Sequence, residues 1–194
     1  MKNDLDQILL TQNVIEQRVK SLGKEIDQHY HDREIIIITL LDGAIVFTAD
    51  LIRHLAIPLR LDCLRVSSYG NSTDPETAPR ILSSLKSDVA GKHVLLVDDI
   101  LDTGNTLRRV HDEVSSKRPA SVHSCVFLDK PDRRQNSFKA DWAGFSIPDE
   151  FVVGYGLDYA GRYRQLPYVA TLKPASYASE EILLQPLQDP MRQT

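Results

Sequence analysis

The chain has 194 residues, 42% of them hydrophobic and 26% charged, which suits a single globular domain with a sizeable core. Its net charge is -4 and its pI is near 5.8, whereas domains that bind duplex nucleic acid are usually basic, so nucleic acid is a poor first candidate for a partner. The chain lacks the pattern of a signal peptide, and no apolar run approaches the roughly 18 residues of a membrane span. We therefore expect a cytoplasmic protein that contacts no membrane.

Helices and strands alternate along the chain. Thr11 is placed to cap a helix in which Ile15, Val19, Leu22 and Ile26 share one face. This alternation predicts an α/β domain over 1–194, with a mostly parallel twisted sheet covered by helices on both faces. Ligands of such folds bind beyond the carboxyl ends of the strands. The elements predicted after the first helix are a buried strand at 34–41, a helix at 44–55, strands at 59–66, at 81–85 and from 94, a helix at 106–116, and strands at 121–128, 142–147, 151–153 and 168–172.

Two segments and two cysteines stand apart from this alternation. Residues 67–79, SSYGNSTDPETAP, hold polar and turn residues, which predicts a mobile loop that either serves the site or lies idle on the surface. Residues 174–194 form a C-terminal tail with little periodicity, and its role is not indicated by the sequence. Cys63 and Cys125 lie in apolar runs without partners at metal-ligand spacing, so we expect both to be reduced and buried.

The stretch 94–107, VLLVDDILDTGNTL, places acids and a glycine directly after an apolar strand. In residues 102–106, Asp-Thr-Gly-Asn-Thr, Gly104 permits a tight turn, and the first N–H groups of the following helix attract an anion. The threonine hydroxyls add donors, so this segment predicts a phosphate cradle, although it lacks the GxxxxGK[ST] pattern of a P-loop. The alternative is that Asp102 only caps the helix.

Asp98 and Asp99 favour the ligand-binding interpretation, because a helix cap needs only one carboxylate. Adjacent carboxylates repel each other unless a cation or a polyol lies between them. Hard cations such as Mg²⁺ take oxygen ligands. The stretch therefore predicts a ligand with a phosphate, neighbouring hydroxyls and a metal ion, which describes a phosphorylated ribose.

The same stretch resembles the phosphoribosyl-pyrophosphate binding motif of the type I phosphoribosyltransferases. Four segments narrow the resemblance to hypoxanthine-guanine phosphoribosyltransferases, and the last is the most specific: 40–55, 65–71, 127–134 and 144–169. The resemblance covers most of residues 10–172. It implies the family fold with a small hood region, a requirement for Mg²⁺, and assembly as a homodimer or homotetramer. The implied reaction joins a 6-oxopurine to 5-phosphoribosyl 1-pyrophosphate and releases pyrophosphate.

The resemblance also assigns the base-binding residues. Asp102 would be the catalytic acid near N7 of the purine, and Lys130 would donate to its O6 atom. An ammonium only donates hydrogen bonds, so it suits a 6-oxo group and not the 6-amino group of adenine. Phe151 would stack on the purine, and the backbone of Val152 would meet the edge of the base. Without the resemblance, Lys130 is interpreted as a surface charge and Phe151-Val152 as part of a core strand.

The remaining implied roles concern the ribose, the pyrophosphate and the metal. Asp42 stands where the family often has Lys, so we expect backbone N–H groups to hold pyrophosphate while this side chain points elsewhere. The family's non-proline cis bond is expected at the same turn. Asp98 stands where the family frequently has Glu, and this change keeps the negative charge. The implied sets are Thr103, Gly104, Asn105 and Thr106 with Asp102 for the 5′-phosphate, Asp98 and Asp99 for ribose, Asp158, Asp98 and Asp99 for Mg²⁺, Asp42, Gly43 and Arg164 for pyrophosphate, and Ser68 and Tyr69 for the closing loop.

Two other functions stay open at this point. A regulator that keeps the fold would sense nucleotides and bind RNA or DNA through a basic face. Here the basic residues are scattered and outnumbered, 23 to 27, which favours an enzyme that forms IMP or GMP in purine salvage. A related enzyme with a pyrimidine or adenine acceptor is disfavoured by the segments around Lys130 and Phe151. The sequence does not rank hypoxanthine, guanine and xanthine.

Overall fold

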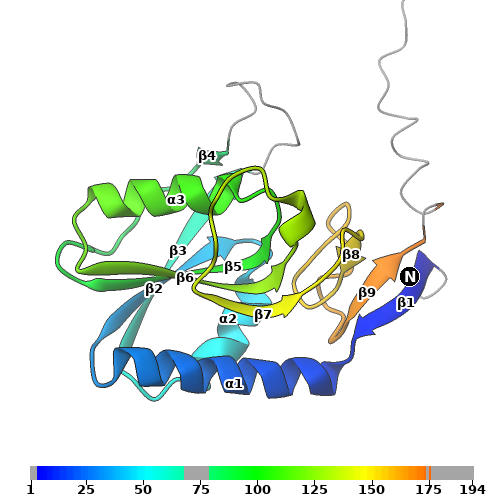
Figure 1. The fold of residues 1–194 in the computed structure, drawn as a ribbon, viewed down its shortest axis with the longest axis horizontal. Helices are drawn as coiled ribbons and strands as arrows, with labels where there is room; N and C mark the ends of the chain where they lie inside the picture. The colour runs from blue at the N-terminus through cyan, green and yellow to red at the C-terminus, as the bar shows by residue number, and fades with distance from the viewer. Residues whose placement is uncertain (1–3, 68–78, 174, 176–194) are drawn as a thin grey trace, which may run out of the picture.

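The computed structural model describes residues 4–67, 79–173 and 175 (Figure 1). The predicted closing-loop residues Ser68 and Tyr69 and nearly all of the tail 174–194 lie outside these residues. The elements in chain order are β1 (Leu5–Leu10), α1 (Gln12–Tyr30), β2 (Ile35–Leu41), α2 (Ile45–Ile52), β3 (Leu59–Ser67), β4 (Arg80–Ile81), β5 (His93–Leu101), α3 (Asn105–Ser116), β6 (Ser121–Asp129), the short 3-10 helix η3 (Pro131–Arg133), β7 (Trp142–Ser146), β8 (Val152–Val153) and β9 (Val169–Leu172).

The large sheet of the described residues has the strand order β4-β3-β2-β5-β6-β7. The pairs β2·β3, β2·β5, β5·β6 and β6·β7 are parallel, and the short β4 is antiparallel to β3. In the centre, Ile35 of β2 is in register with both Leu59 of β3 and His93 of β5. The prediction of a mostly parallel α/β sheet is therefore confirmed. Because the strands are parallel, their carboxyl ends meet at one edge of the sheet.

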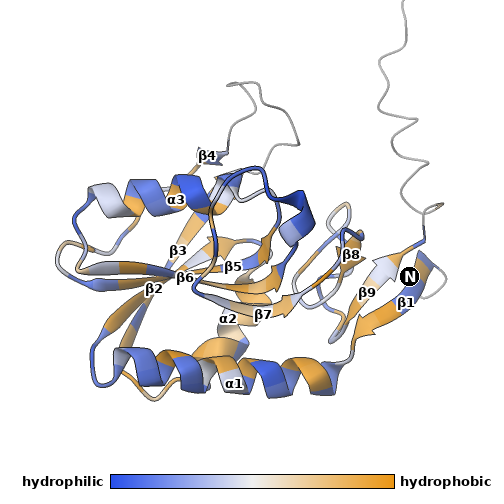
Figure 2. Ribbon diagram, in the orientation of Figure 1, coloured by the Kyte–Doolittle hydropathy of each residue, from blue (hydrophilic) through white to orange (hydrophobic). Residues whose placement is uncertain are grey.

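Helices cover both faces of this sheet, as predicted (Figure 1). Ile35 and Ile37 pack on one side with α1 and α2, while Ile36 and Ile38 pack on the other side with α3. Side chains of a strand alternate between faces, so a run of isoleucines buried on both sides identifies a central strand. Figure 2 shows mostly hydrophobic residues in the central strands and in α2, and a mixture of hydrophilic and hydrophobic residues in α1 and α3.

A second, small sheet forms the hood beside the large sheet, and its described strands have the order β1-β9-β8. All of its pairs are antiparallel, and Leu5 of β1 lies opposite Leu172 of β9. The sequence reasoning anticipated a hood but did not predict β1. Its pairing with β9 contains register shifts, and Ile8 is 55% exposed, so this segment lacks a regular apolar alternation.

The structure corrects three further expectations. Cys125 is buried, but Cys63 is exposed. Asp62 and Leu64 turn to the buried face of β3, while Cys63 lies on the face that also exposes Leu61, so its apolar neighbours gave a misleading signal. The strand predicted at 81–85 is only the two-residue β4. Thr11 occupies the N-cap position of α1, yet its side chain makes no capping hydrogen bond.

In the part of the chain that the structure describes, every helix is too short or too polar to span a membrane.

Candidate active site

The site lies where the carboxyl ends of the central strands face the hood. Gly43 follows β2, Asp98 and Asp99 belong to the last part of β5, and Lys130 follows β6. The peptide bond between Leu41 and Asp42 is cis, as the family resemblance led us to expect. The sheet register thus brings together segments that are up to 90 residues apart in the chain.

Gly43 is the point of closest approach within the site. A Cβ atom at this position would overlap the Asp99 carboxylate, and a Cβ atom at Gly156 would overlap the carbonyl oxygen of Gly43. Gly156 also has a φ of 101°, which side chains rarely adopt. The loop after β2 therefore packs closely between β5 and the hood: a side chain at Gly43 would displace the Asp99 carboxylate, and the backbone contact at Gly156 leaves no room for one.

Asp98 and Asp99 form a neighbouring pair of carboxyl groups at the end of β5. Asp98 is buried, and its Oδ1 accepts a hydrogen bond of 3.0 Å from the backbone N–H of Asp99. Burial, followed by the charge of Asp99, raises the pKa of Asp98 well above its ordinary value, and burial also raises the pKa of Asp99. A pair whose ionisation is this unfavourable would be stabilised by a cation or by sugar hydroxyls.

The predicted phosphate loop, residues 102–106, connects β5 to α3. The N-cap of α3 is Gly104, with a φ of 85°, so Asp102 is not the helix cap that the sequence left open. Residues 134–136 brace the loop: the N–H of Gln135 donates to the Thr103 carbonyl at 3.0 Å, and Asn136 Nδ2 donates to Asn105 Oδ1 at 2.9 Å. The loop is thereby fixed directly before the N-terminus of α3, whose first backbone N–H groups attract an anion.

The carboxylate of Asp102 pairs with Arg133 at the end of η3. Arg133 Nε lies 2.7 Å from Asp102 Oδ1, and Arg133 Nη1 lies 3.2 Å from Oδ1 of Asp149. The neighbouring Arg134 donates to the carbonyl oxygen of Asp102 and pairs with the carboxylate of Asp129. Both arginines thus tie the segment after β6 to the loop that precedes α3.

Lys130 is buried, with its Nζ 2.6 Å from the carbonyl oxygen of Glu150 and 3.8 Å from Asp149 Oδ1. Burial lowers the pKa of Lys130, and the charges of Asp102 and Asp149 oppose that effect. The surface-charge interpretation of Lys130 is therefore wrong. A buried ammonium beside the segment that leads into Phe151 is placed to donate to a ligand.

Phe151 and Val152 follow Glu150 directly in the chain, and one is partly exposed while the other is buried. Phe151 is 43% exposed and contacts Tyr159 edge to face, with ring centroids 5.4 Å apart. Val152 is buried in β8, where it pairs with Thr171 of β9. Phe151 is therefore not the core residue of the alternative interpretation, and its ring leaves a flat surface on which a base can stack.

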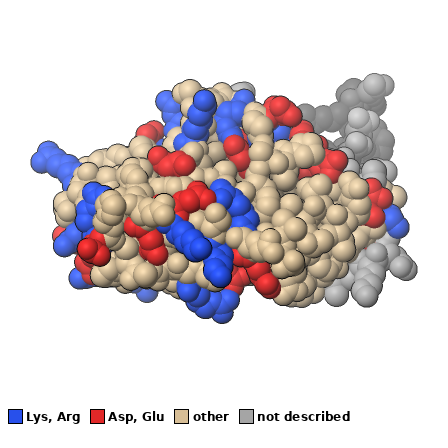
Figure 3. Space-filling model, turned by 60° about the horizontal axis from the view of Figure 1, so that its bottom comes forward, with Lys and Arg blue, Asp and Glu red and all other residues tan. Residues whose placement is uncertain are grey.

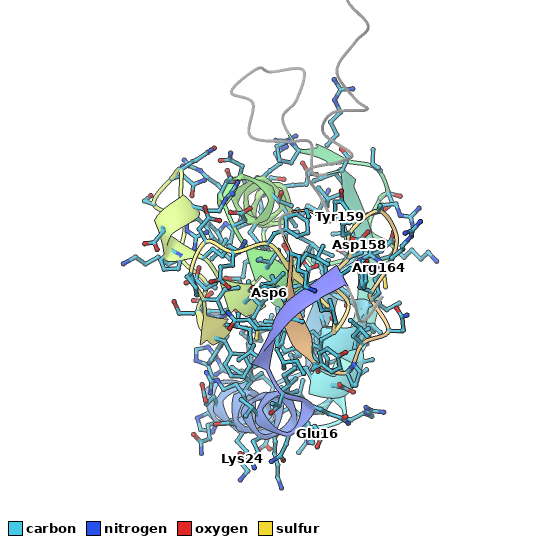
Figure 4. All side chains as sticks on the ribbon, turned by 90° about the vertical axis from the view of Figure 1, so that its right-hand side faces the viewer. Asp6, Glu16, Lys24, Asp158, Tyr159 and Arg164 are labelled. Carbon is cyan, nitrogen blue, oxygen red and sulfur yellow. The ribbon has the colours of Figure 1, made fainter. Side chains whose placement is uncertain are left out.

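Arg164 and Asp158 come from the long loop between β8 and β9, and Figure 4 shows them beside Tyr159 and far from Glu16 and Lys24 of α1. Arg164 Nη2 lies 2.8 Å from Asp158 Oδ1, and Nη1 donates to the carbonyl oxygen of Gly156 at 2.6 Å. Because Gly156 packs on Gly43, Arg164 is brought to the loop after β2. Its charge also reaches Asp99, where it opposes the rise in that residue's pKa.

Asp42 makes an ion pair with Arg65, 2.7 Å from Asp42 Oδ1 to Arg65 Nη2. Leu41 and Arg65 are partners in the parallel pairing of β2 and β3, so the register sets this contact. Arg65 offsets the carboxylate charge that would repel pyrophosphate at this turn. The expectation that the Asp42 side chain points to another partner agrees with this geometry.

The described residues contain no group of three or more His, Cys, Asp or Glu side chains arranged to hold a metal ion. Asp98 and Asp99 lie on β5, whereas Asp158 is held by Arg164 and accepts a hydrogen bond from the Gly161 N–H at 2.8 Å. Mg²⁺ commonly binds through one or two carboxylates plus substrate phosphates and water. The carboxylates of Asp98, Asp99 and Asp158 therefore fit Mg²⁺ if substrate phosphates and water supply the other ligands.

Comparison with known proteins decides the family. Residues 5–160 match the phosphoribosyl transferase domain. The chain belongs to the phosphoribosyl transferase family. It is 44% identical to the hypoxanthine-guanine phosphoribosyltransferase of Bacillus subtilis over 179 residues, which are 92% of this chain and 99% of that protein. It is 41% identical over 172 residues to the hypoxanthine phosphoribosyltransferase of Haemophilus influenzae, covering 87% of this chain and 96% of the relative.

Solved structures of this family share the fold. A crystal structure of a hypoxanthine phosphoribosyltransferase from Staphylococcus aureus superposes with a TM-score of 0.87 at 40% identity, covering 91% of this chain and 96% of that one. The type I phosphoribosyltransferase fold expected from the sequence is thereby confirmed.

The sequence reasoning missed several residues that the structure brings to the site. They lie in the segments named above. The charges of Arg65 and Arg133 were visible but their partners were not, because each pairs with a carboxylate more than about 20 residues away, and Gly156 gave no charge signal at all. These residues are Arg65, Arg133, Arg134, Asp149 and Gly156.

Replacing Gly43 with Ala should weaken binding of 5-phosphoribosyl 1-pyrophosphate, measured with Mg²⁺ in the buffer, by at least about 10-fold, because the new Cβ overlaps the Asp99 carboxylate and a misplaced contact of about 1 Å is costly. Titration calorimetry measures this affinity. Gly91→Ala, at the opposite end of β5, is the control for a general loss of stability, since a Cβ there meets nothing within 4 Å while its φ of 65° strains the backbone. A Gly43→Ala protein that binds like the wild type would contradict this account of the turn.

Asp98→Asn should stabilise the ligand-free protein at neutral pH. Because the pKa of Asp98 is raised, the native state binds more protons than the unfolded state, and stability falls as pH rises from about 4 through the raised pKa. The amide removes this loss and still accepts from the Asp99 N–H. We expect a gain of at least about 1 kcal/mol, since one pKa unit corresponds to about 1.4 kcal/mol.

Urea denaturation between pH 4 and 8 measures this effect. Asp88→Asn is a matched control, because Asp88 is exposed and accepts a similar backbone hydrogen bond from Ala90 at 3.0 Å. An Asp98→Asn protein that is less stable than the wild type at pH 7 would show that the carboxyl pair is not strained.

Arg65→Gln should leave the Asp42 carboxylate uncompensated and weaken binding of 5-phosphoribosyl 1-pyrophosphate by about 3- to 10-fold, a modest effect because the pair is exposed. The double variant Asp42→Asn with Arg65→Gln removes both charges and should recover most of the affinity. Arg60→Gln, which breaks a pair with Glu34 at the other end of β3, is the control. Equal weakening in the single and double variants would rule out compensation by Arg65.

Proposed function

We propose that the chain is a purine salvage transferase that forms IMP or GMP and pyrophosphate from hypoxanthine or guanine and 5-phosphoribosyl 1-pyrophosphate. One observation carries the choice of base: the buried Lys130 ammonium lies next to Glu150, directly before the half-exposed ring of Phe151. A donor-only group beside a stacking ring recognises a flat base with an acceptor at the 6-position. The family and the relatives support the same reaction.

The groups that would act on the substrates follow from their positions. Asp102 would take or steer the N7 proton while N9 attacks the anomeric carbon, and general acid–base groups of this kind contribute about 10²- to 10⁴-fold in rate. Residues 102–106 would hold the 5′-phosphate through the N-terminus of α3. Arg164 and the backbone at Asp42-Gly43 would hold pyrophosphate, because a guanidinium matches two phosphate oxygens at once.

Mg²⁺ would complete the site together with the substrate. Asp98 and Asp99 would hold the ribose hydroxyls and the ion, and Asp158 would contribute a second carboxylate. When bound, Mg²⁺ neutralises charge on pyrophosphate as it leaves. The raised pKa of Asp98 supports this assignment, because a nearby cation favours its ionised form.

The remaining assignments extend the resemblance. Ser68 and Tyr69 would close over the site as part of a mobile loop at 67–79 and exclude water from an oxocarbenium-like transition state. The chain would act in the cytoplasm as a single domain, 1–194, assembled as a homodimer or homotetramer.

The regulator that binds RNA or DNA has little support. On the face shown in Figure 3, Lys and Arg side chains are interspersed with Asp and Glu and form no continuous basic surface. Arginines of the site, such as Arg133 and Arg164, are paired with carboxylates. Phosphate backbones are bound mainly by unpaired basic side chains, so we do not propose nucleic acid as a partner.

A panel of bases tests the proposed reaction. With Mg²⁺ and 5-phosphoribosyl 1-pyrophosphate, the protein should release pyrophosphate in the presence of hypoxanthine or guanine but not of adenine or uracil, as followed by a coupled pyrophosphate assay. Xanthine belongs in the panel because the 2-position is not assigned. Inactivity with every 6-oxopurine would overturn the proposal.

Lys130→Ala should lower kcat/KM for hypoxanthine by about 10- to 100-fold, the worth of a hydrogen bond from a charged donor. The rate with adenine should not fall in parallel, because the 6-amino group gains nothing from an ammonium. Lys139→Ala, at an exposed position, is the control. A variant with unchanged preference between the two bases would exclude Lys130 as the determinant.

A further inference from the structure

Arg133 connects two carboxylates that come from different parts of the site. Its Nε is 2.7 Å from Asp102 Oδ1, in the loop before α3, and its Nη1 is 3.2 Å from Asp149 Oδ1, just before the base-binding segment. Its side chain is 30% exposed, so it is largely enclosed by these segments. One guanidinium therefore fixes the proposed catalytic acid relative to the residues that would bind the base.

The two sides of the Asp102 carboxylate differ in their surroundings. Oδ1 is buried beneath Arg133, whose Nε holds it in a short ion pair. The side chain as a whole is nevertheless 37% exposed, so its accessible surface lies on the part away from Oδ1. Arg133 thus covers one oxygen and leaves the other side of the carboxyl group open to the site.

Asp102 and Lys130 also act on each other electrostatically. The charge of Asp102 opposes the fall in the pKa of Lys130, so the two groups are close enough to interact. Released from Arg133, the carboxylate would be drawn to the buried ammonium, and both would be lost to the base. With Arg133 in place, the positive charges of Arg133 and Lys130 balance the negative charges of Asp102 and Asp149. The Lys130 ammonium then stays directed at the Glu150 carbonyl.

We propose that Arg133 is a positioning residue for the transfer reaction: its bridge between Asp102 and Asp149 presents the Asp102 carboxyl group to the bound purine and keeps it from pairing with Lys130. Arg133 itself touches neither reacting atom. Arg134 has a different task, because its partners are the Asp102 carbonyl oxygen and Asp129. The inference rests on the proposed function.

The test is Arg133→Gln, compared with the wild type in kcat, in KM for hypoxanthine and in KM for 5-phosphoribosyl 1-pyrophosphate. We expect kcat to fall by about 10- to 100-fold, the usual cost of a misplaced catalytic group, with KM for 5-phosphoribosyl 1-pyrophosphate within about 2-fold of the wild type. Arg133→Lys should recover part of the rate, because an ammonium can pair with one carboxylate but not bridge two. Arg60→Gln is the matched control on a surface ion pair.

The Asp102→Asn background separates this role from a structural one. If Arg133 acts through Asp102, adding Arg133→Gln to Asp102→Asn lowers kcat no further, whereas independent effects would multiply. Three outcomes would each overturn the inference: the kcat losses of Arg133→Gln and Asp102→Asn multiply fully in the double variant, kcat of Arg133→Gln stays within about 2-fold of the wild type, or Arg133→Lys and Arg133→Gln lose equal activity. If Arg133→Gln does not fold, Asp149→Asn carries the test, since it frees one end of the bridge and should lower kcat less. Inactivity of the wild type with all 6-oxopurines would instead defeat the proposed function.

Discussion

The contact of Gly43 with the Asp99 carboxylate sets the spacing of the whole site. It exists because β2 and β5 are parallel neighbours in a register that runs from Ile35 opposite His93 to Thr39 opposite Val97. The apolar run that buries both strands therefore determines where the loops beyond them meet. Gly156 of the hood then packs on the same glycine, so the position of Arg164 also depends on that register.

The charges of the site follow a simple pattern. Five carboxylates pair with arginines: Asp42 with Arg65, Asp102 and Asp149 with Arg133, Asp129 with Arg134, and Asp158 with Arg164. In the described part of the chain, no ion pair reaches Asp98 or Asp99. Negative charge at the end of β5 is thus offset only at a distance, by Arg164, although burial makes it most unfavourable there. That is the location at which a cation or a diol stabilises the protein most.

Much of this arrangement is predictable from local sequence. The isoleucine run of β2 predicts a buried strand, and the acids that end β5 predict a ligand site at the end of a strand. The hood strand β1 and the exposure of Cys63 were not predictable, because both depend on what packs against the segment and not on the segment itself. The roles of Arg65 and Arg133 were hidden for the same reason, since a charged side chain carries no local sign of its partner.

The pairing of β1 with β9 has a consequence for the order of assembly. Leu5 meets Leu172, so the hood cannot form until nearly all of the described chain has left the ribosome, whereas the strands β2, β3 and β5 lie within the first 101 residues. Contacts between residues so distant in sequence form slowly, because the intervening loop must first be closed. A nascent chain would therefore complete the central strands of the large sheet well before the hood can close beside them.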